Sequence, residues 1–207
     1  MNAAACTSAP PAGLIDLIVK SGMADAINCL PAGIKGNKNA VAETIANNVR
    51  SKIIKEHLND PAFYDRMSAL LQEILADLKA ARIDYEEFLK RIATQVVQPL
   101  HAGKADDTPA TLDTPGKRAL YSNLKQAQPR SDHAAGVNDA VGVYEGDGDR
   151  ALERALRIHE SVKKRRPHGW RGVHAKEQII KGALYDVLQD DAEVERLFLI
   201  VWAQTEY

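Results

Sequence analysis

The first half of the chain carries apolar residues at helical spacing. Over residues 37–100 they recur every three or four positions in three successive runs, which predicts three amphipathic helices joined by short connections. Asn37 is expected to cap the first helix, Pro61 lies in the first turn of the second, and Asp84 opens the third. Ahead of these runs, two short helical pieces meet at Ser21-Gly22, and the stretch "LPAGIKGNK" reads as a turn. The three runs predict an antiparallel bundle.

The second half shows shorter helical patterns. One helix is expected to start at Thr114-Pro115, another to cover residues 152–162, and the last two to cover residues 179–188 and 194–202. Residues 126–150 are rich in Gly and Asp, which predicts a variable loop with a partial helix. No strand pattern is visible. We therefore predict an all-α fold, with a disordered leader over residues 1–12, a helical bundle over 13–104 and a smaller helical subdomain over 105–207.

The run "AVAETIANNVRSKII" has two stripes when it is drawn as a helix. The apolar stripe faces a core, and the second one combines Glu43, Asn47, Arg50 and Ile54 at spacings of four, three and four residues. Asn48 lies beside the second stripe. Asn and Arg offer several directed hydrogen bonds, which suits contact with a partner subunit or another domain. The alternative is that Asn47 and Arg50 bond to neighbouring helices of this chain.

Composition limits the classes of function. Phenylalanine occurs three times in 207 residues, so the core must be built from aliphatic side chains, and the net charge of −1 gives no overall attraction to nucleic acid. Cys6 and Cys29 do not make a disulfide framework, and no apolar run approaches the roughly 18 residues that cross a bilayer. The N-terminal residues lack a secretory pattern. We expect a cytoplasmic protein without a membrane partner.

No arrangement of residues predicts catalysis. The phosphate-loop pattern is absent, the six histidines are scattered without further ligands at metal spacing, and no nucleophile lies near a base in the sequence. The sequence therefore predicts no catalytic, cofactor-binding or metal-binding residue in this chain.

The strongest local feature is the basic run "KKRRPHGWRG". Four cations end a predicted helix, and an aromatic residue and another arginine follow, which is a combination that can bind a phosphate backbone. The alternative is that these cations are solvated at a helix C-terminus while the tryptophan anchors the loop to the core. An acidic protein surface could use the same run. The nucleic-acid-contact candidates are Lys163, Lys164, Arg165, Arg166, Trp170 and Arg171.

A second set of candidates lies on the helix after Thr114. Lys117, Arg118 and Tyr121 could contact DNA phosphates or a partner protein. The alternative is ordinary exposed charge, with Tyr121 packed inward.

Six stretches, in order, resemble the C-terminal helical region of type I restriction endonuclease R subunits. Three lie in the first half of the chain: "LPAGIKGNKNAVAETIANNVRSKII", "FYDRMSALLQEIL" and "DYEEFLKRI". Three lie in the second half: "TPGKRALYSNL", "WRG" and "KEQIIKGAL". The resemblance covers most of the chain from Gly13 onward. The chain departs from the family pattern over residues 126–150, and its basic run before Trp170 is more basic than is usual in the family.

The resemblance implies a part of an ATP-driven DNA translocase and nuclease. In that family, the nuclease and motor domains lie upstream of this region, so ATP and magnesium are expected only there and this chain corresponds to the helical region alone. The implied partners are the modification and specificity subunits of the methyltransferase core, the upstream motor and nuclease domains, and DNA as a further candidate. The implied role is docking of the R subunit. The alternative is an independent nucleic-acid-binding or regulatory helical protein that uses residues 163–171. A third reading, that the chain is itself a hydrolase, is supported only by the name of the family.

Overall fold

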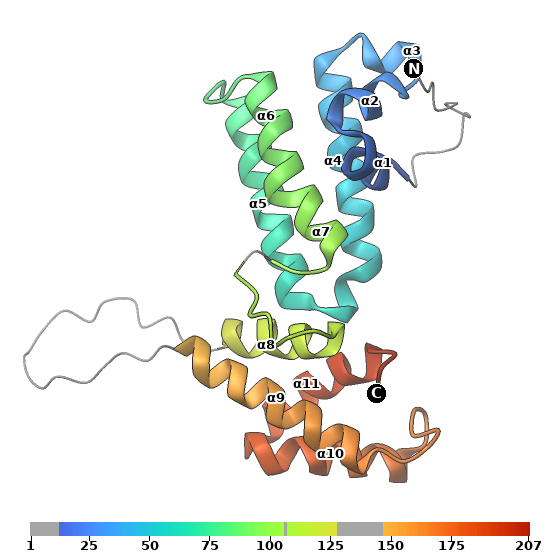
Figure 1. The fold of residues 1–207 in the computed structure, drawn as a ribbon, viewed down its shortest axis with the longest axis vertical. Helices are drawn as coiled ribbons and strands as arrows, with labels where there is room; N and C mark the ends of the chain where they lie inside the picture. Colours follow the sequence, from blue (N-terminus) through green and yellow to red (C-terminus); the bar gives the residue numbers. More distant parts are fainter. Residues whose placement is uncertain (1–12, 106, 128–146) are drawn as a thin grey trace, which may run out of the picture. The chain divides into compact units, whose positions relative to one another are not determined.

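The computed structural model describes residues 13–105, 107–127 and 147–207 (Figure 1). Every regular element in those ranges is helical, which confirms the predicted all-α class. The chain divides into two compact units, and the division falls between Asp107 and Thr108. The sequence placed it between residues 104 and 105. The sequence did not indicate that Leu58–Phe63 belongs to the second unit, as the structure has it.

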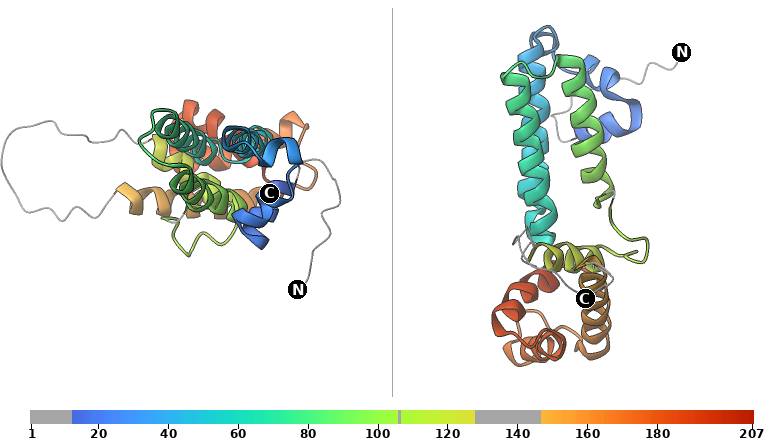
Figure 2. Two further views of the ribbon diagram at one scale, coloured as in Figure 1. Left: turned by 90° about the horizontal axis from the view of Figure 1, so that it is seen from above. Right: turned by 90° about the vertical axis from the view of Figure 1, so that its left-hand side faces the viewer.

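The first unit is built on three long helical runs that lie side by side and antiparallel, as Figures 1 and 2 show. α1 packs against α4, η3 and α7, while α3 forms one helical turn within the predicted turn "LPAGIKGNK". The elements up to the end of this bundle are α1 (Leu14–Ser21), α2 (Met23–Asn28), α3 (Ala32–Lys35), α4 (Lys38–Glu56), η2 (His57–Asn59), α5 (Pro61–Lys79), α6 (Tyr85–Arg91), η3 (Ile92–Val97) and α7 (Gln98–Ala102).

Local capping fixes the starts of the long helices. The Asn37 side chain accepts hydrogen bonds from the amides of Asn39 and Ala40, and the Asp84 carboxylate accepts one from the Glu87 amide at 2.8 Å. These bonds satisfy amide groups that have no partner inside the helix, so both predicted starts are confirmed. The predicted core stripe of α4 is buried, and it consists of Val41, Ala42, Ile45, Val49 and Ile53.

The third run is not one regular helix. η3 is a π-helical segment between α6 and α7, and Pro99 lies at the start of α7. Proline has no amide hydrogen to donate, so the regular ladder of hydrogen bonds cannot pass through this position, and the wider turn lies directly before it. Phe88, Ile92, Val96 and Leu100 nevertheless all reach the core, as their spacing predicts.

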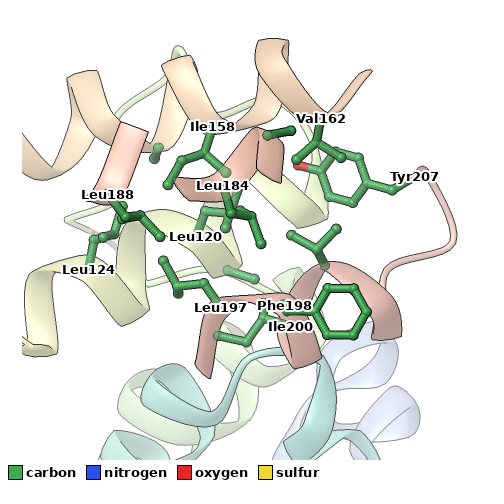
Figure 3. Close-up of a cluster of buried hydrophobic side chains, with 14 of the residues drawn as sticks. Leu120, Leu124, Ile158, Val162, Leu184, Leu188, Leu197, Phe198, Ile200 and Tyr207 are labelled. Atoms are coloured by element: carbon green, nitrogen blue, oxygen red, sulfur yellow. The ribbon is translucent and has the colours of Figure 1, made fainter. Parts of the chain in front are cut away.

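Among its described residues, the second unit is built mainly on four helices: α8 (Pro115–Ala127), α9 (Asp147–Arg165), α10 (His174–Leu188) and α11 (Asp191–Ala203). Contacts run from α8 to α9, α9 to α10, α10 to α11 and α11 back to α8, so the four helices enclose one core. Figure 3 shows aliphatic side chains of all four helices pointing into it. The largest of them that are fully buried are Leu120, Ile158, Ile180, Leu184 and Leu197.

Polar contacts explain why residues 58–63 belong to this unit. Asn123 is buried, and its side-chain amide donates to the Asp60 carboxylate at 2.9 Å and to the Ala119 carbonyl at 2.8 Å. Gln204, also buried, donates to the Asn59 carbonyl at 2.6 Å. Buried amides are costly when unpaired, so these bonds fix Asn59 and Asp60 to the second unit.

Several boundaries differ from those expected. α10 begins five residues before the predicted start because the Val173 carbonyl accepts from the amides of Lys176 and Glu177, in a polar first turn that shows no apolar pattern. α11 begins at Asp191, capped by the Asp190 carboxylate. Both ends of the predicted loop 126–150 are helical, and its middle lies outside the described residues, as does the predicted leader. None of the described helices combines the length and the apolar character that crossing a bilayer requires.

Candidate interaction surfaces

The second stripe of α4 lies on the surface of the first unit. Glu43, Asn47, Arg50 and Ile54 are all exposed, and the Ile54 side chain keeps 75% of its surface in contact with solvent. Arg50 donates from Nη1 to the Asn47 side-chain oxygen at 3.0 Å, within the same helix. Among the described residues, the hydrogen bond of Asn47 and Arg50 therefore lies within α4 and does not reach a neighbouring helix, as the alternative had predicted. The stripe brings an amide, a guanidinium and an isoleucine together on one open face.

Asn48 differs from the rest of this stripe. It is half-buried, and its side-chain amide donates to the Thr44 carbonyl at 2.9 Å, while the Thr44 hydroxyl donates to the Ala40 carbonyl at 2.7 Å. Both side chains thus bond back to their own helix. Asn48 marks the edge of the exposed face rather than its centre.

The arginines of the basic run hold the end of the second unit. Arg166 donates to the Glu206 carbonyl at 2.8 Å, and Arg171 donates from Nε to the Trp202 carbonyl at 2.8 Å and from Nη2 to the Gln204 carbonyl. A planar guanidinium suits such a two-pronged contact. Arg165 forms a surface ion pair with Asp186. Three of the predicted nucleic-acid contacts therefore have partners within the chain.

Trp170 is a buried anchor. Only 3% of it is exposed, its ring meets the Phe198 ring edge-on at 6.0 Å between centroids, and the Arg171 guanidinium lies 4.6 Å from its ring centroid. A ring in this position cannot stack on a base. The predicted surface role of Trp170 is therefore wrong, and the alternative of a loop anchor describes it.

The candidates on α8 are mostly engaged as well. Lys117 pairs with Asp113 at 2.7 Å, and Arg118 donates from Nη1 to the Asp113 carbonyl at 3.2 Å. Tyr121 is only 7% exposed and packs in the core. Contact of a partner with Tyr121 is therefore excluded by its burial, and the inward-packed alternative describes it.

One arrangement on the second unit has no local signal in the sequence. Lys117 from α8 and Lys163 and Lys164 from α9 line a common hollow of about 470 Å³, together with Leu156, His159 and Glu160. We refer to this site as the lysine hollow. The sequence named these three lysines as candidates, but in two separate groups. Their convergence depends on how α8 packs against α9, which periodicity does not predict.

The base of the lysine hollow is held from inside the unit. His159 is 7% exposed, and its Nδ1 lies 2.8 Å from the Tyr207 hydroxyl. Burial lowers the pKa of His159, and the nearby Glu206 carboxylate opposes this shift. Burial also raises the pKa of Tyr207 well above its usual range. In the sequence, His159 is one of six scattered histidines, and no local pattern points to Tyr207.

Two further features of the described residues bear on ligand binding. These residues contain no group of three or more His, Cys, Asp or Glu side chains that could hold a metal ion. A hollow of about 540 Å³ on the first unit, between α2 and the α6–η3 run, is lined mainly by apolar side chains such as Met23, Ile27, Leu89 and Ala93.

Comparison with models of known protein families finds no match to this chain. Comparisons with curated proteins and with solved structures also find none that is similar.

Proposed function

We propose that the chain is a helical assembly domain of a type I restriction endonuclease R subunit, which docks the motor and nuclease part onto the methyltransferase core. Six sequence stretches that resemble this region support the proposal, and so does an all-α chain whose surfaces suit binding. The assembly would form in the cytoplasm with the modification and specificity subunits. ATP and magnesium would be bound by the upstream domains.

The exposed face of α4 carries the proposal. Ile54 is an aliphatic side chain with three quarters of its surface in water, and covering it would contribute about 1.5–3 kcal/mol of burial free energy. Arg50 lies one turn away and is already oriented by its bond to Asn47. An arginine beside an apolar residue is a common centre of protein interfaces because it supplies several directed donors at a dry contact. A partner subunit would use both.

The test is size-exclusion chromatography with light scattering on the chain mixed with its cognate methyltransferase core. Co-elution at a defined stoichiometry is expected at low salt. Separate elution, with both proteins folded, would contradict docking by this region alone.

A nucleic-acid-binding protein that uses residues 163–171 is a second candidate, and it is weaker in that form. Arg165, Arg166 and Arg171 have partners within the chain, and Trp170 is buried. What remains on the surface is a different arrangement, the lysine hollow.

A further inference from the structure

The lysine hollow collects positive charge from two helices. Lys117 lies in the first turn of α8, whereas Lys163 and Lys164 lie in the last turn of α9. Like charges repel, so three ammonium groups around one hollow have a cost that an anion between them would remove. Such an arrangement differs from cations scattered over a surface.

The outer face of α9 extends this positive region. The chain has a net charge of −1, yet residues 149–165 expose six cations and three carboxylates, and one of these cations, Arg165, is paired with Asp186. The cations are Arg150, Arg154, Arg157, Lys163, Lys164 and Arg165, and the carboxylates are Asp149, Glu153 and Glu160. A local excess of this kind attracts anions even when the whole protein is close to neutral.

Two of the three lysines are available to a ligand. Lys163 and Lys164 are exposed, and within the described part of the chain neither ammonium group forms a hydrogen bond or an ion pair. The Lys117 side chain is only 18% exposed and is held at 2.7 Å from Asp113, whose carboxylate is mostly solvated. One ammonium group is thus fixed, while two flexible ones can close over a bound group.

Charges of both signs surround the base of the lysine hollow. Burial is the main cause that lowers the pKa of His159, Lys117 and Lys163 lower it further, and Glu206 and Asp113 oppose this shift. Glu206 is itself committed, because its carboxylate accepts the Gly116 amide at 2.5 Å at the start of α8. Glu160 is the one carboxylate among the side chains that line the hollow.

We propose that the lysine hollow binds phosphate groups, with Lys117, Lys163 and Lys164 as the contacts. Lysine ammonium groups bind phosphate as point charges without demanding a fixed fork geometry. The volume of about 470 Å³ leaves room for a phosphate that is carried on a larger body. This body is either the backbone of a nucleic acid or a small molecule with more than one phosphate. The proposal does not rest on the docking function.

The test measures two probes against the full chain at low salt. A fluorescently labelled DNA duplex of arbitrary sequence is followed by anisotropy, and inorganic pyrophosphate is followed by calorimetry. The test variant replaces all three hollow lysines by glutamine. The control variant makes the same charge change at Lys20, Lys55 and Lys79, which are exposed on helices of the first unit.

The proposal expects at least one probe to bind and to lose about tenfold or more in affinity in the hollow variant only. If the duplex binds, the slope of log affinity against log salt should fall by about 3 in that variant, roughly one per lost phosphate contact. Binding of pyrophosphate without the duplex would identify a small phosphate ligand, and the reverse would identify a nucleic acid backbone. Absence of binding by both probes, or equal losses in the two variants, would overturn the proposal.

Discussion

The ring of Tyr207 lies directly against the backbone of Gly116. A β-carbon on residue 116 would come within 2.8 Å of the tyrosine Cε2 and 2.9 Å of its hydroxyl oxygen, which is closer than real β-carbons approach other atoms. The same hydroxyl meets His159, and Glu206 caps the Gly116 amide. The absence of a side chain at residue 116 therefore lets the last residues of the second unit close over α8.

Replacing Gly116 by alanine should destabilise the second unit by about 1–3 kcal/mol, the usual cost of inserting a carbon into a packed core. Alanine is the better helix former, so the steric cost must exceed a gain of up to about 1 kcal/mol in helix propensity. Trp170 and Trp202 are the two tryptophans of the chain, and both lie in the second unit. Urea unfolding followed by tryptophan fluorescence therefore reports on this unit.

Gly182 provides the matched control. It lies inside α10, is exposed, and a β-carbon there would meet no atom within 4 Å. Gly182→Ala should therefore stabilise the unit by about 0.5–1 kcal/mol. Equal effects of the two substitutions would show that Tyr207 does not pack on Gly116 as described.

Arg171 should be far more sensitive to replacement by lysine than Arg165. The Arg171 fork reaches the carbonyls of Trp202 and Gln204, and a lysine cannot make both bonds while covering the Trp170 ring. We expect Arg171→Lys to cost about 1–3 kcal/mol because it leaves a carbonyl without its donor. Arg165→Lys keeps a surface ion pair with Asp186 and should change stability by less than about 1 kcal/mol.

The same fluorescence-detected unfolding measures both arginine variants, and their net charges are identical. If Arg165→Lys lowered the free energy of unfolding as much as Arg171→Lys, the structural role given to Arg171 would be contradicted.

His159 should make the second unit less stable at acidic pH. Burial lowers its pKa below the usual value near 6.5, so the unfolded chain takes up a proton more readily than the folded one. The stabilisation from neutral His159 is fully present above about pH 6.5 and is lost as the pH falls through the folded pKa. Unfolding free energies measured between about pH 7 and pH 5 should therefore decline.

The His159→Gln variant tests this assignment, because glutamine can still bond to the Tyr207 hydroxyl but does not titrate. Its stability should decline less steeply over the same pH range. Identical slopes in the two proteins would exclude His159 as the source.

The parts of the fold that depend on neighbouring residues could be predicted from the sequence. The cap at Asn37 follows from its residue type ahead of an apolar run, the buried stripe of α4 follows from spacing, and both occur. The π-helical segment before Pro99 was missed because periodicity indicates that a residue faces inward but not how wide each turn is. The first turn of α10 was missed because its polar residues carry no apolar signal.

The surfaces were predicted less well for a related reason. A basic run looks the same in sequence whether its cations face water or bond to carbonyls far along the chain, as Arg166 and Arg171 do. Lys117 and Lys163 line one hollow only because α8 packs against α9. Gly116 meets Tyr207 only because the end of the chain packs against α8. These are long-range contacts, which local patterns do not encode.

The most direct test of the docking proposal is the affinity of the chain for its cognate methyltransferase core when α4 is altered. The test variant carries both Arg50→Glu and Ile54→Asp, which change the proposed contact face. The control variant carries only Lys55→Glu, which reverses a charge on another side of the same helix. We predict about a hundredfold or greater weakening for the double variant, as for central interface residues, and little change for the control. Unchanged affinity of a folded double variant would contradict docking through this face.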